Sequence, residues 1–186
     1  MNMQIPYVKV YLLVLSFLVA MAARAQGENL LQNPGFEGDG HWVAEGSASL
    51  QNQWRSHEGG QFNAAILGMW ATQGDEGYIL HEHVVVVPDT RYQLSAWLWA
   101  DLGWMPGEQY MSIAFYSDGG ELLDQVKAVI PEIHPYWTPM KCLAVSPSNA
   151  VSARICIGAR NISHHGALTI DDVSFNVVPP EPELSE

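Results

Sequence analysis

The segment Leu168-Thr-Ile-Asp-Asp-Val-Ser-Phe175, near the end of the chain, is typical of a β-strand. Side chains of a strand point alternately to its two sides, so Val173 and Phe175 share one face. The same alternation places Asp171 on that apolar face. The sequence therefore predicts a strand over Ala167–Val177 with a carboxylate among core residues, where its charge must be compensated.

Nine further segments have a similar period and are separated by turns rich in Gly, Pro, Asn and Asp. No segment has the pattern of a long amphipathic helix. Ten short strands without an internal repeat predict an all-β fold, a β-sandwich of the jelly-roll type. The other expected strands are Asn29–Gln32, Ala48–Gln51, Asn63–Gly68, Tyr78–Val87, Arg91–Ala100, Gln109–Ser117, Gln125–Val129, Trp137–Val145 and Val151–Gly158.

The composition limits the class of protein. The chain has 186 residues, 48% of them hydrophobic, which excludes a wholly disordered protein. Its 20 Asp and Glu exceed its 8 Lys and Arg, and the net charge of −12 argues against a nucleic-acid partner, which would need a basic surface. Two cysteines are too few for a disulfide scaffold or a four-cysteine zinc site. The length suits one domain with its own core.

Residues 1–25 are predicted to be a signal peptide. An apolar run over Val10–Ala23 leads into Ala23-Arg24-Ala25, the small-x-small pattern that signal peptidase accepts. This run is shorter than the roughly 20 residues of a membrane span, although a single transmembrane anchor is the alternative. We therefore expect a secreted, periplasmic or extracellular protein without a membrane span after cleavage. Its domain would occupy residues 26–178, and residues 179–186 would form a Pro- and Glu-rich tail or the start of a linker.

Motifs at the two ends of this domain indicate a family resemblance. Asn29-Leu-Leu-Gln-Asn-Pro-Gly-Phe-Glu37 lies near the start, the Leu168–Phe175 segment lies near the end, and Tyr92-Gln-Leu-Ser-Ala-Trp97 lies between them. In this order the motifs resemble the carbohydrate-binding modules of families 4, 9 and 22, within the wider galactose-binding-domain-like jelly rolls. Asp89 departs from the pattern, because the family commonly has Gly in that turn. The resemblance implies the fold more strongly than a particular ligand, because the fold also serves in adhesion and in enzyme accessory domains.

The resemblance also implies a bound metal ion. Modules of this family often hold a structural Ca²⁺ that ties the first strand to the last, and Ca²⁺ prefers carboxylate and carbonyl oxygens. Carried over by position, the ligands are the carboxylates of Glu37 and Asp171 and the backbone carbonyls of Glu58 and Gln61. The alternative is that Asp171 accepts hydrogen bonds from backbone amides and Glu37 is solvated.

The tryptophans fall into two groups. The resemblance implies structural roles for Trp42, Trp97 and Trp137. Three others lie in or beside turn-rich segments, where an indole has no obvious core to enter. An exposed indole offers a flat apolar face to the C–H face of a pyranose, and burial under a neighbouring loop is the alternative. The candidate ligand-binding residues are therefore Trp104, Trp70 and Trp54.

Cys142 and Cys156 flank a chain reversal near Asn149, so they could lie opposite each other on adjacent strands. In an exported protein this arrangement predicts a disulfide, and two buried thiols are the alternative.

Together these features predict a secreted, non-catalytic module that binds glycans or polysaccharides. No nucleophile elbow, P-loop or His-Glu-x-x-His motif indicates catalysis. The alternative function is an extracellular protein-interaction or adhesion module on the same fold, without a sugar site. Its oligomeric state and its sugar are not specified by these patterns.

Overall fold

The computed structural model describes residues 27–68 and 75–179. The predicted signal peptide, Trp70 and nearly all of the predicted tail lie outside these described residues. The described part consists of strands and connecting loops, and it contains no helix long and apolar enough to cross a membrane.

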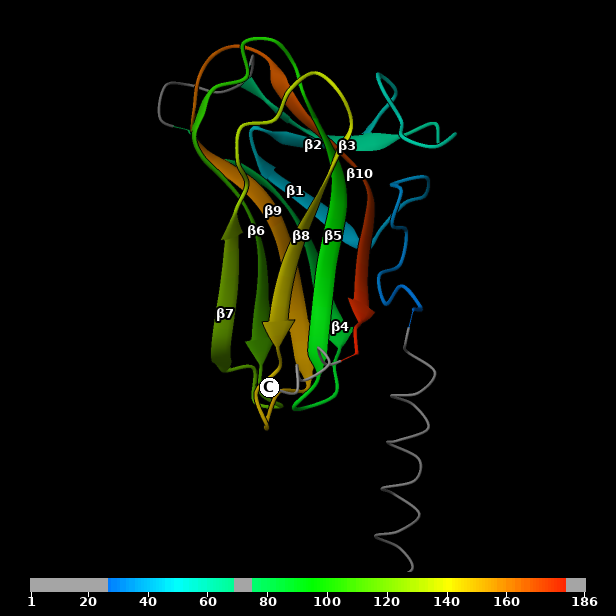
Figure 1. Ribbon diagram of the computed structural model, residues 1–186, viewed down its shortest axis with the longest axis vertical. Coiled ribbons are helices and arrows are strands. Elements are labelled where there is room, and N and C mark those ends of the chain that lie inside the picture. Colours follow the sequence, from blue (N-terminus) through cyan, green and yellow to red (C-terminus); the bar gives the residue numbers. More distant parts are fainter. Residues whose placement is uncertain (1–26, 69–74, 180–186) are drawn as a thin grey trace, which may run out of the picture.

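Ten antiparallel strands form two five-stranded sheets that pack face to face, so the prediction of an all-β sandwich is confirmed. In Figure 1 the strands β5, β8 and β10 of one sheet lie in front of β4, β6 and β9 of the other. The first sheet has the order β1 (Trp42–Gly46), β4 (Gly77–Val85), β9 (Ser152–Ile162), β6 (Pro106–Tyr116) and β7 (Leu122–Val129). The second sheet has the order β2 (Ala48–Asn52), β3 (Asn63–Leu67), β10 (Ala167–Val177), β5 (Arg91–Ala100) and β8 (Thr138–Val145).

The core lies between the sheets and follows the alternation in the sequence. Along β5, Leu94, Ala96 and Leu98 are buried in the core, and Ser95 and Trp97, which alternate with them, are half-buried on the outer face. Phe115 of β6 and Ile155 of β9 fill the core from the first sheet. This pattern gives each sheet one apolar inner face and one outer face that is free to carry other side chains.

The strand β10 is irregular in the middle, and this corrects the predicted direction of Asp171. Its pairing with β5 shifts register between Asp171 and Ser174, and Asp172 has a positive φ of 44°. Because of this bulge, Ile170 and Val173 both join the core, and Asp171 pairs with Trp97 on the outer face. The carboxylate is buried as predicted, but beneath a loop outside the sandwich rather than between the sheets.

The first motif does not form the predicted strand over Asn29–Gln32. Instead, the Asn29 side chain binds β10: its Nδ2 donates to the Val173 carbonyl at 2.9 Å and its Oδ1 accepts from the Phe175 amide at 3.0 Å. The Leu30 amide donates to the Phe175 carbonyl at 2.9 Å. These hydrogen bonds, two of them made by the Asn29 side chain, hold this segment against β10 in place of regular strand pairing. The first strand begins later, at Trp42.

The predicted disulfide is wrong. Cys142 and Cys156 are free thiols, because β8 belongs to the second sheet and β9 to the first. The chain reversal near Asn149 crosses from one sheet to the other rather than forming a hairpin. Cys142 is buried, while Cys156 faces outward from the first sheet.

Candidate functional site

A groove of about 460 Å³ runs over the outer face of the first sheet. Its floor is β9, where alternate residues of one face project outward from Arg154 to Arg160. We call this site the groove. Its lining consists of Glu76, Tyr78, Leu80, Tyr110, Ser112, Ala114, Tyr116, Gln125, Lys127, Arg154, Cys156 and Arg160.

Gly158 makes room for the aromatic part of the groove. It pairs with Tyr78 on one side and with Tyr110 on the other. A Cβ at this position would lie 2.8 Å from Cζ and Oη of Tyr110 and 3.0 Å from Cβ of Tyr78. The absence of a side chain on the central strand therefore allows the Tyr110 ring to lie across the sheet.

Cations surround the tyrosine rings. Lys127 Nζ lies 4.0 Å from the centre of the Tyr110 ring, and Arg160 Cζ lies 5.6 Å from it. Arg154 Cζ lies 5.5 Å from the centre of the Tyr116 ring. These distances allow cation–π attraction, which orients the rings and the basic groups together.

Three titratable groups of the groove, Tyr78, Tyr110 and Cys156, stay neutral near pH 7. The hydrogen bond from Tyr78 to Glu45 Oε2, at 2.5 Å, raises the pKa of Tyr78 to about 12. Burial raises the pKa of Tyr110 to about 12 and that of the Cys156 thiol to about 11. The charge of the groove therefore comes from Lys127, Arg154, Arg160 and Glu76.

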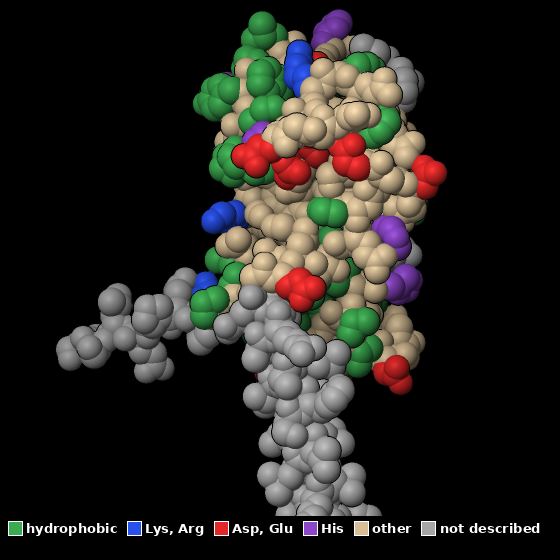
Figure 2. Space-filling model, turned by 90° about the vertical axis from the view of Figure 1, so that its right-hand side faces the viewer, with side chains coloured by type: hydrophobic (Ala, Val, Ile, Leu, Met, Phe, Trp, Pro, Cys, Tyr) green, Lys and Arg blue, Asp and Glu red, His purple; other side chains and the backbone are tan. Residues whose placement is uncertain are grey.

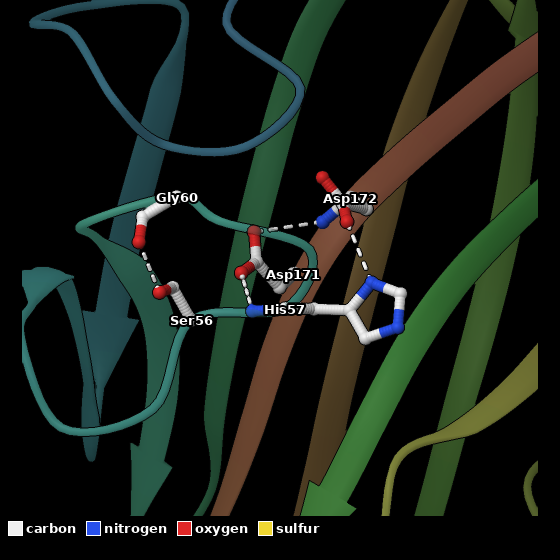
Figure 3. Close-up of polar contacts among 5 residues, drawn as sticks. All are labelled: Ser56, His57, Gly60, Asp171 and Asp172. Carbon is white, nitrogen blue, oxygen red and sulfur yellow. Dashed lines mark hydrogen bonds and ion pairs between the residues drawn. The ribbon is translucent and has the colours of Figure 1, made fainter.

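A second site lies where the loop after β2 covers β10. Figure 2 shows Asp and Glu side chains gathered in a band across this side of the molecule. The His57 amide donates to Asp171 Oδ2 at 2.7 Å, and His57 Nδ1 lies 2.7 Å from Asp172 Oδ2 (Figure 3). The same ring stacks on Trp97 with ring centres 4.2 Å apart. We call the group Glu37, His57, Glu58, Asp171 and Asp172 the acidic corner.

The ionised form of Asp171 is disfavoured in the acidic corner, by burial and by the neighbouring carboxylates. Burial raises the pKa of Asp171 to about 6, and the neighbouring Asp172 and Glu37 add to the rise, although the His57 and Asp172 amides oppose it. Among the described residues, no hydrogen bond to these three carboxylates comes from Lys or Arg. The corner is therefore a concentration of negative charge that an added cation would relieve.

The four residues predicted to supply metal ligands lie at or beside the acidic corner, which does not by itself test their role as ligands. Glu37 Oε1 accepts hydrogen bonds from the Gln61 and Phe62 amides at 2.7 and 3.0 Å. The Asp171 carboxylate accepts hydrogen bonds from the His57 and Asp172 amides. Glu58 offers a ligand atom within 4.8 Å of atoms from His57 and Asp172. The amide contacts of Asp171 are those of the alternative considered above, whereas Glu37 also accepts amides instead of being only solvated. Asp172 and His57 are members that the sequence did not indicate.

Glycines leave open space between these carboxylates. A Cβ on Gly35 would lie 3.7 Å from Asp171 Oδ1 and 3.6 Å from Asp172 Oδ1, and one on Gly60 would collide with Glu37 Oε1. Hard oxygen donors around such a space are the donor set that Ca²⁺ prefers. The residues present therefore fit the ion that the resemblance implies.

Two of the three tryptophans expected at the ligand site lie in the described residues, and they differ in exposure. Trp104 is only 7% exposed, and its indole N–H donates to Gln109 Oε1 at 2.9 Å, so the expectation that it lacks a core to enter is wrong. Trp54 is 58% exposed, as expected of a ligand contact. Neither lines the groove.

Trp42 is buried in the core, as the resemblance implies, with its indole N–H donating to the Asn33 carbonyl at 2.8 Å. Trp97 and Trp137 instead lie half-buried outside the sandwich, both against the His57 ring. Thus the tryptophan-rich surface belongs to the second sheet and the tyrosine-rich groove to the first.

Comparisons with known proteins agree with this architecture. No protein-family model matches the chain, and no curated protein matches its sequence. Among solved structures, the xylan-binding domain CBM22-1 of Paenibacillus barcinonensis Xyn10C aligns with a TM-score of 0.59 and 16% identity, covering 83% of this chain and 97% of that one. A family 61 carbohydrate-binding module in complex with β-1,4-galactotriose aligns with a TM-score of 0.54 and 16% identity, covering 80% and 97%.

The active domain of tailspike protein 4 from bacteriophage CBA120 aligns with a TM-score of 0.62 and 17% identity over 81% of this chain. This chain corresponds to only 21% of that one. At these identities the similarity establishes the fold. The chain therefore has the β-sandwich fold of carbohydrate-binding modules.

The groove was not predicted, although its residues carry a signal in the sequence. Tyr110, Ser112 and Tyr116 recur at even spacing in one expected strand, and Arg154 and Cys156 do so in another, beyond whose expected end Arg160 continues the same spacing. The outward face of these strands therefore carries aromatic as well as polar side chains, unlike a strand face that is only solvated. The signal was missed because sequence does not show which strands are neighbours.

Proposed function

We propose that this protein is a secreted, non-catalytic module that binds a glycan chain in the groove. The observation that carries the proposal is an open groove on a sheet face, lined by tyrosines, amides, hydroxyls and charged groups. The fold shared with carbohydrate-binding modules supports it. A rigid sheet face suits a polymer, because the chain can lie along the strands without a closing lid.

In this proposal the half-buried rings of Tyr78 and Tyr116 offer apolar surface to sugar C–H groups. Gln125 and Ser112 are hydrogen-bonded to each other at 3.4 Å, a long contact that sugar hydroxyls can replace. Trp54, exposed on a loop, stays a candidate for an additional contact. Trp70, outside the described residues, also stays a candidate, whereas the burial of Trp104 assigns it to packing.

The test is a panel of soluble polysaccharides and a glycan array with the wild-type chain, Tyr78→Ala and Tyr116→Ala. We expect at least one glycan to bind and each variant to weaken its binding about tenfold, because losing the contact between one aromatic ring and a sugar should cost about 1.4 kcal/mol. Tyr136→Ala is the matched control, because this tyrosine is 57% exposed in the segment before β8, away from the groove.

If both groove variants kept the glycan affinity of the wild-type chain, the glycan would bind outside the groove. Trp54→Ala would then test binding at the loops. Absence of any glycan ligand would overturn the proposal and favour the alternative, an extracellular protein-interaction or adhesion module without a sugar site.

We further propose that the acidic corner holds a structural Ca²⁺. Glu37 and Asp171 would supply carboxylate oxygens, Glu58 and Gln61 would supply backbone carbonyls, and Asp172 is close enough to contribute. The ion would offset the mutual repulsion of these groups and tie the first motif and the β2–β3 loop to β10. It would stabilise the sandwich without touching the glycan.

Calorimetric titration of chelator-treated protein with Ca²⁺ tests this site. We expect binding heat and a rise in melting temperature, because a ligand at 100 times its Kd stabilises the folded state by about 2.7 kcal/mol. Asp171→Asn should lose both effects, and Asp124→Asn, an exposed residue of β7, should keep them. If the wild-type chain showed no binding heat and no stabilisation on addition of Ca²⁺, the ion would be excluded.

A further inference from the structure

The groove has a charge opposite to that of the rest of the molecule. Beyond residue 26 the sequence contains six Lys and Arg and 20 Asp and Glu. Three of these six cations line the groove, whereas Glu76 is the single carboxylate in its lining. An acidic protein thus places half of its cations on one small part of its surface.

The cations are distributed along the groove rather than clustered at one point. Arg154 and Arg160 are six residues apart on one face of β9, which corresponds to about 20 Å at the rise of a β-strand. Lys127 projects from β7, on the other side of β6. A single terminal anion would occupy one of these positions. A chain with repeated negative groups can reach all of them.

The acidic partners of two of these cations, Arg160 and Lys127, leave them accessible to a ligand. Arg160 Nε lies 3.3 Å from Glu76 Oε2, with both side chains about half exposed, at 53% and 54%. Lys127 Nζ lies 2.7 Å from Glu108 Oε1, with both about one-third exposed. Exposed pairs of this kind contribute about 0–1 kcal/mol, so an anionic ligand can compete for the cations at small cost.

Two of the cations approach the same ring, because Lys127 and Arg160 both lie within 6 Å of the Tyr110 centre. Their mutual repulsion is reduced when a negative group binds beside them. The ring itself is neutral, so it cannot supply that charge.

From these observations we propose that the groove selects anionic glycans, that is, polysaccharides with carboxylate or sulfate groups repeated along the chain. The tyrosines would contact the sugar rings, and Arg154, Arg160 and Lys127 would bind the negative groups. Arginine suits this role, because its planar guanidinium donates two parallel hydrogen bonds to a carboxylate or sulfate. This inference rests on the proposed function and names the ligand class of the same groove.

The test uses ligand pairs that differ only in charge. The full chain is titrated with polygalacturonate and with the same backbone fully methyl-esterified, and then with dextran sulfate and dextran. We expect the charged member of at least one pair to bind at least tenfold more tightly, with an affinity that falls linearly with salt on logarithmic axes. The pair that shows the effect distinguishes carboxylate from sulfate recognition.

Arg154→Gln should weaken binding of the charged member at least fivefold and reduce the slope of its affinity against salt on logarithmic axes, because one cation of the groove is removed. Lys141→Gln is the matched control, because this exposed lysine lies on β8 of the opposite sheet. Poly-glutamate should not compete, since it lacks sugar rings.

Three results would overturn the inference. Equal or tighter binding of neutral glycans, still lost in Tyr78→Ala, would refute anion selection and leave the proposed function intact. Equal loss in the Arg154 and Lys141 variants, or competition by poly-glutamate, would show a general charge effect rather than recognition in the groove. Failure of every glycan in these pairs and in the wider panel would overturn the proposed function as well.

Discussion

The groove and the acidic corner occupy the outer faces of the two sheets, and they differ in charge and in access to solvent. The groove is open and gathers three cations beside tyrosine rings. In the acidic corner the loop over β10 buries Asp171, which is 1% exposed, whereas Glu37 and Glu58 remain exposed. Charge is therefore not spread evenly over the molecule: three of the six Lys and Arg beyond residue 26 line the groove, and carboxylates gather around the loop over β10.

The two sites also differ in how they are built. The groove stands on the middle strands β4, β9 and β6, which are paired along most of their length. The acidic corner depends on a bulge and on non-glycine residues with positive φ, Glu58 at 42° and Asp172 at 44°. A pre-formed surface suits ligand binding, whereas a locally strained junction suits an ion that holds it together.

The largest expected effect tests whether Trp104 contributes to the stability of the fold or to glycan binding. Trp104→Ala should lower the free energy of unfolding by about 3–5 kcal/mol, because it removes a buried indole and its hydrogen bond to Gln109. Glycan affinity of the folded protein should not change. Urea unfolding measures the first quantity and calorimetry the second, with the exposed Trp54→Ala as the control, expected within about 0.5 kcal/mol of wild type. Unchanged stability with lost glycan binding would restore Trp104 to the ligand site.

The next effect concerns the acidic corner and pH. The pKa of Asp171 is raised from 3.8 to about 6, so the folded protein holds a proton that the unfolded chain has released. In chelator-treated protein this contribution to stability is complete below about pH 4 and is lost as the pH rises through 6. It amounts to at most about 3 kcal/mol. Unfolding free energies at pH 4 to 7 should therefore fall more steeply for wild type than for Asp171→Asn.

Added Ca²⁺ should remove that fall in stability, because the ion binds the ionised carboxylate. Parallel pH curves for wild type and Asp171→Asn would show that Asp171 titrates at its ordinary value.

A smaller effect tests the floor of the groove. Gly158→Val should weaken glycan binding at least tenfold, about 1.4 kcal/mol, because the new side chain displaces the Tyr110 ring. Affinity is measured by calorimetry on protein whose circular dichroism matches wild type. Gly119→Ala is the control, because a Cβ there meets only Ser117 Oγ at 3.8 Å. A Gly158 variant with full affinity would place the ligand away from β9.

The smallest effect is expected from reduction. Because Cys142 and Cys156 lie in different sheets as free thiols, dithiothreitol should leave the melting temperature and glycan affinity unchanged. Alkylation of denatured, unreduced protein should label both residues, as mass spectrometry would show. A single unlabelled species with a higher melting temperature would indicate a disulfide after all.

Much of the strand pattern was predictable, because alternation along a segment such as Arg91–Ala100 depends only on neighbours in the chain. Nine of the ten expected segments overlap strands, and the exception, Asn29–Gln32, binds β10 through the Asn29 side chain instead. The gathering of Glu37, Glu58, Gln61 and Asp171 was also anticipated, through a resemblance between motifs rather than through periodicity.

The sequence by itself determined the all-β class, the apolar inner faces and the excess of acid, because these follow from composition and from a local two-residue period. Only the tertiary structure decided that Asp171 faces away from the core, that the two cysteines lie in different sheets, and that three cations share a groove with tyrosines. These outcomes depend on a bulge that shifts the period and on which strands become neighbours. Both are set by packing between segments that lie far apart in the chain.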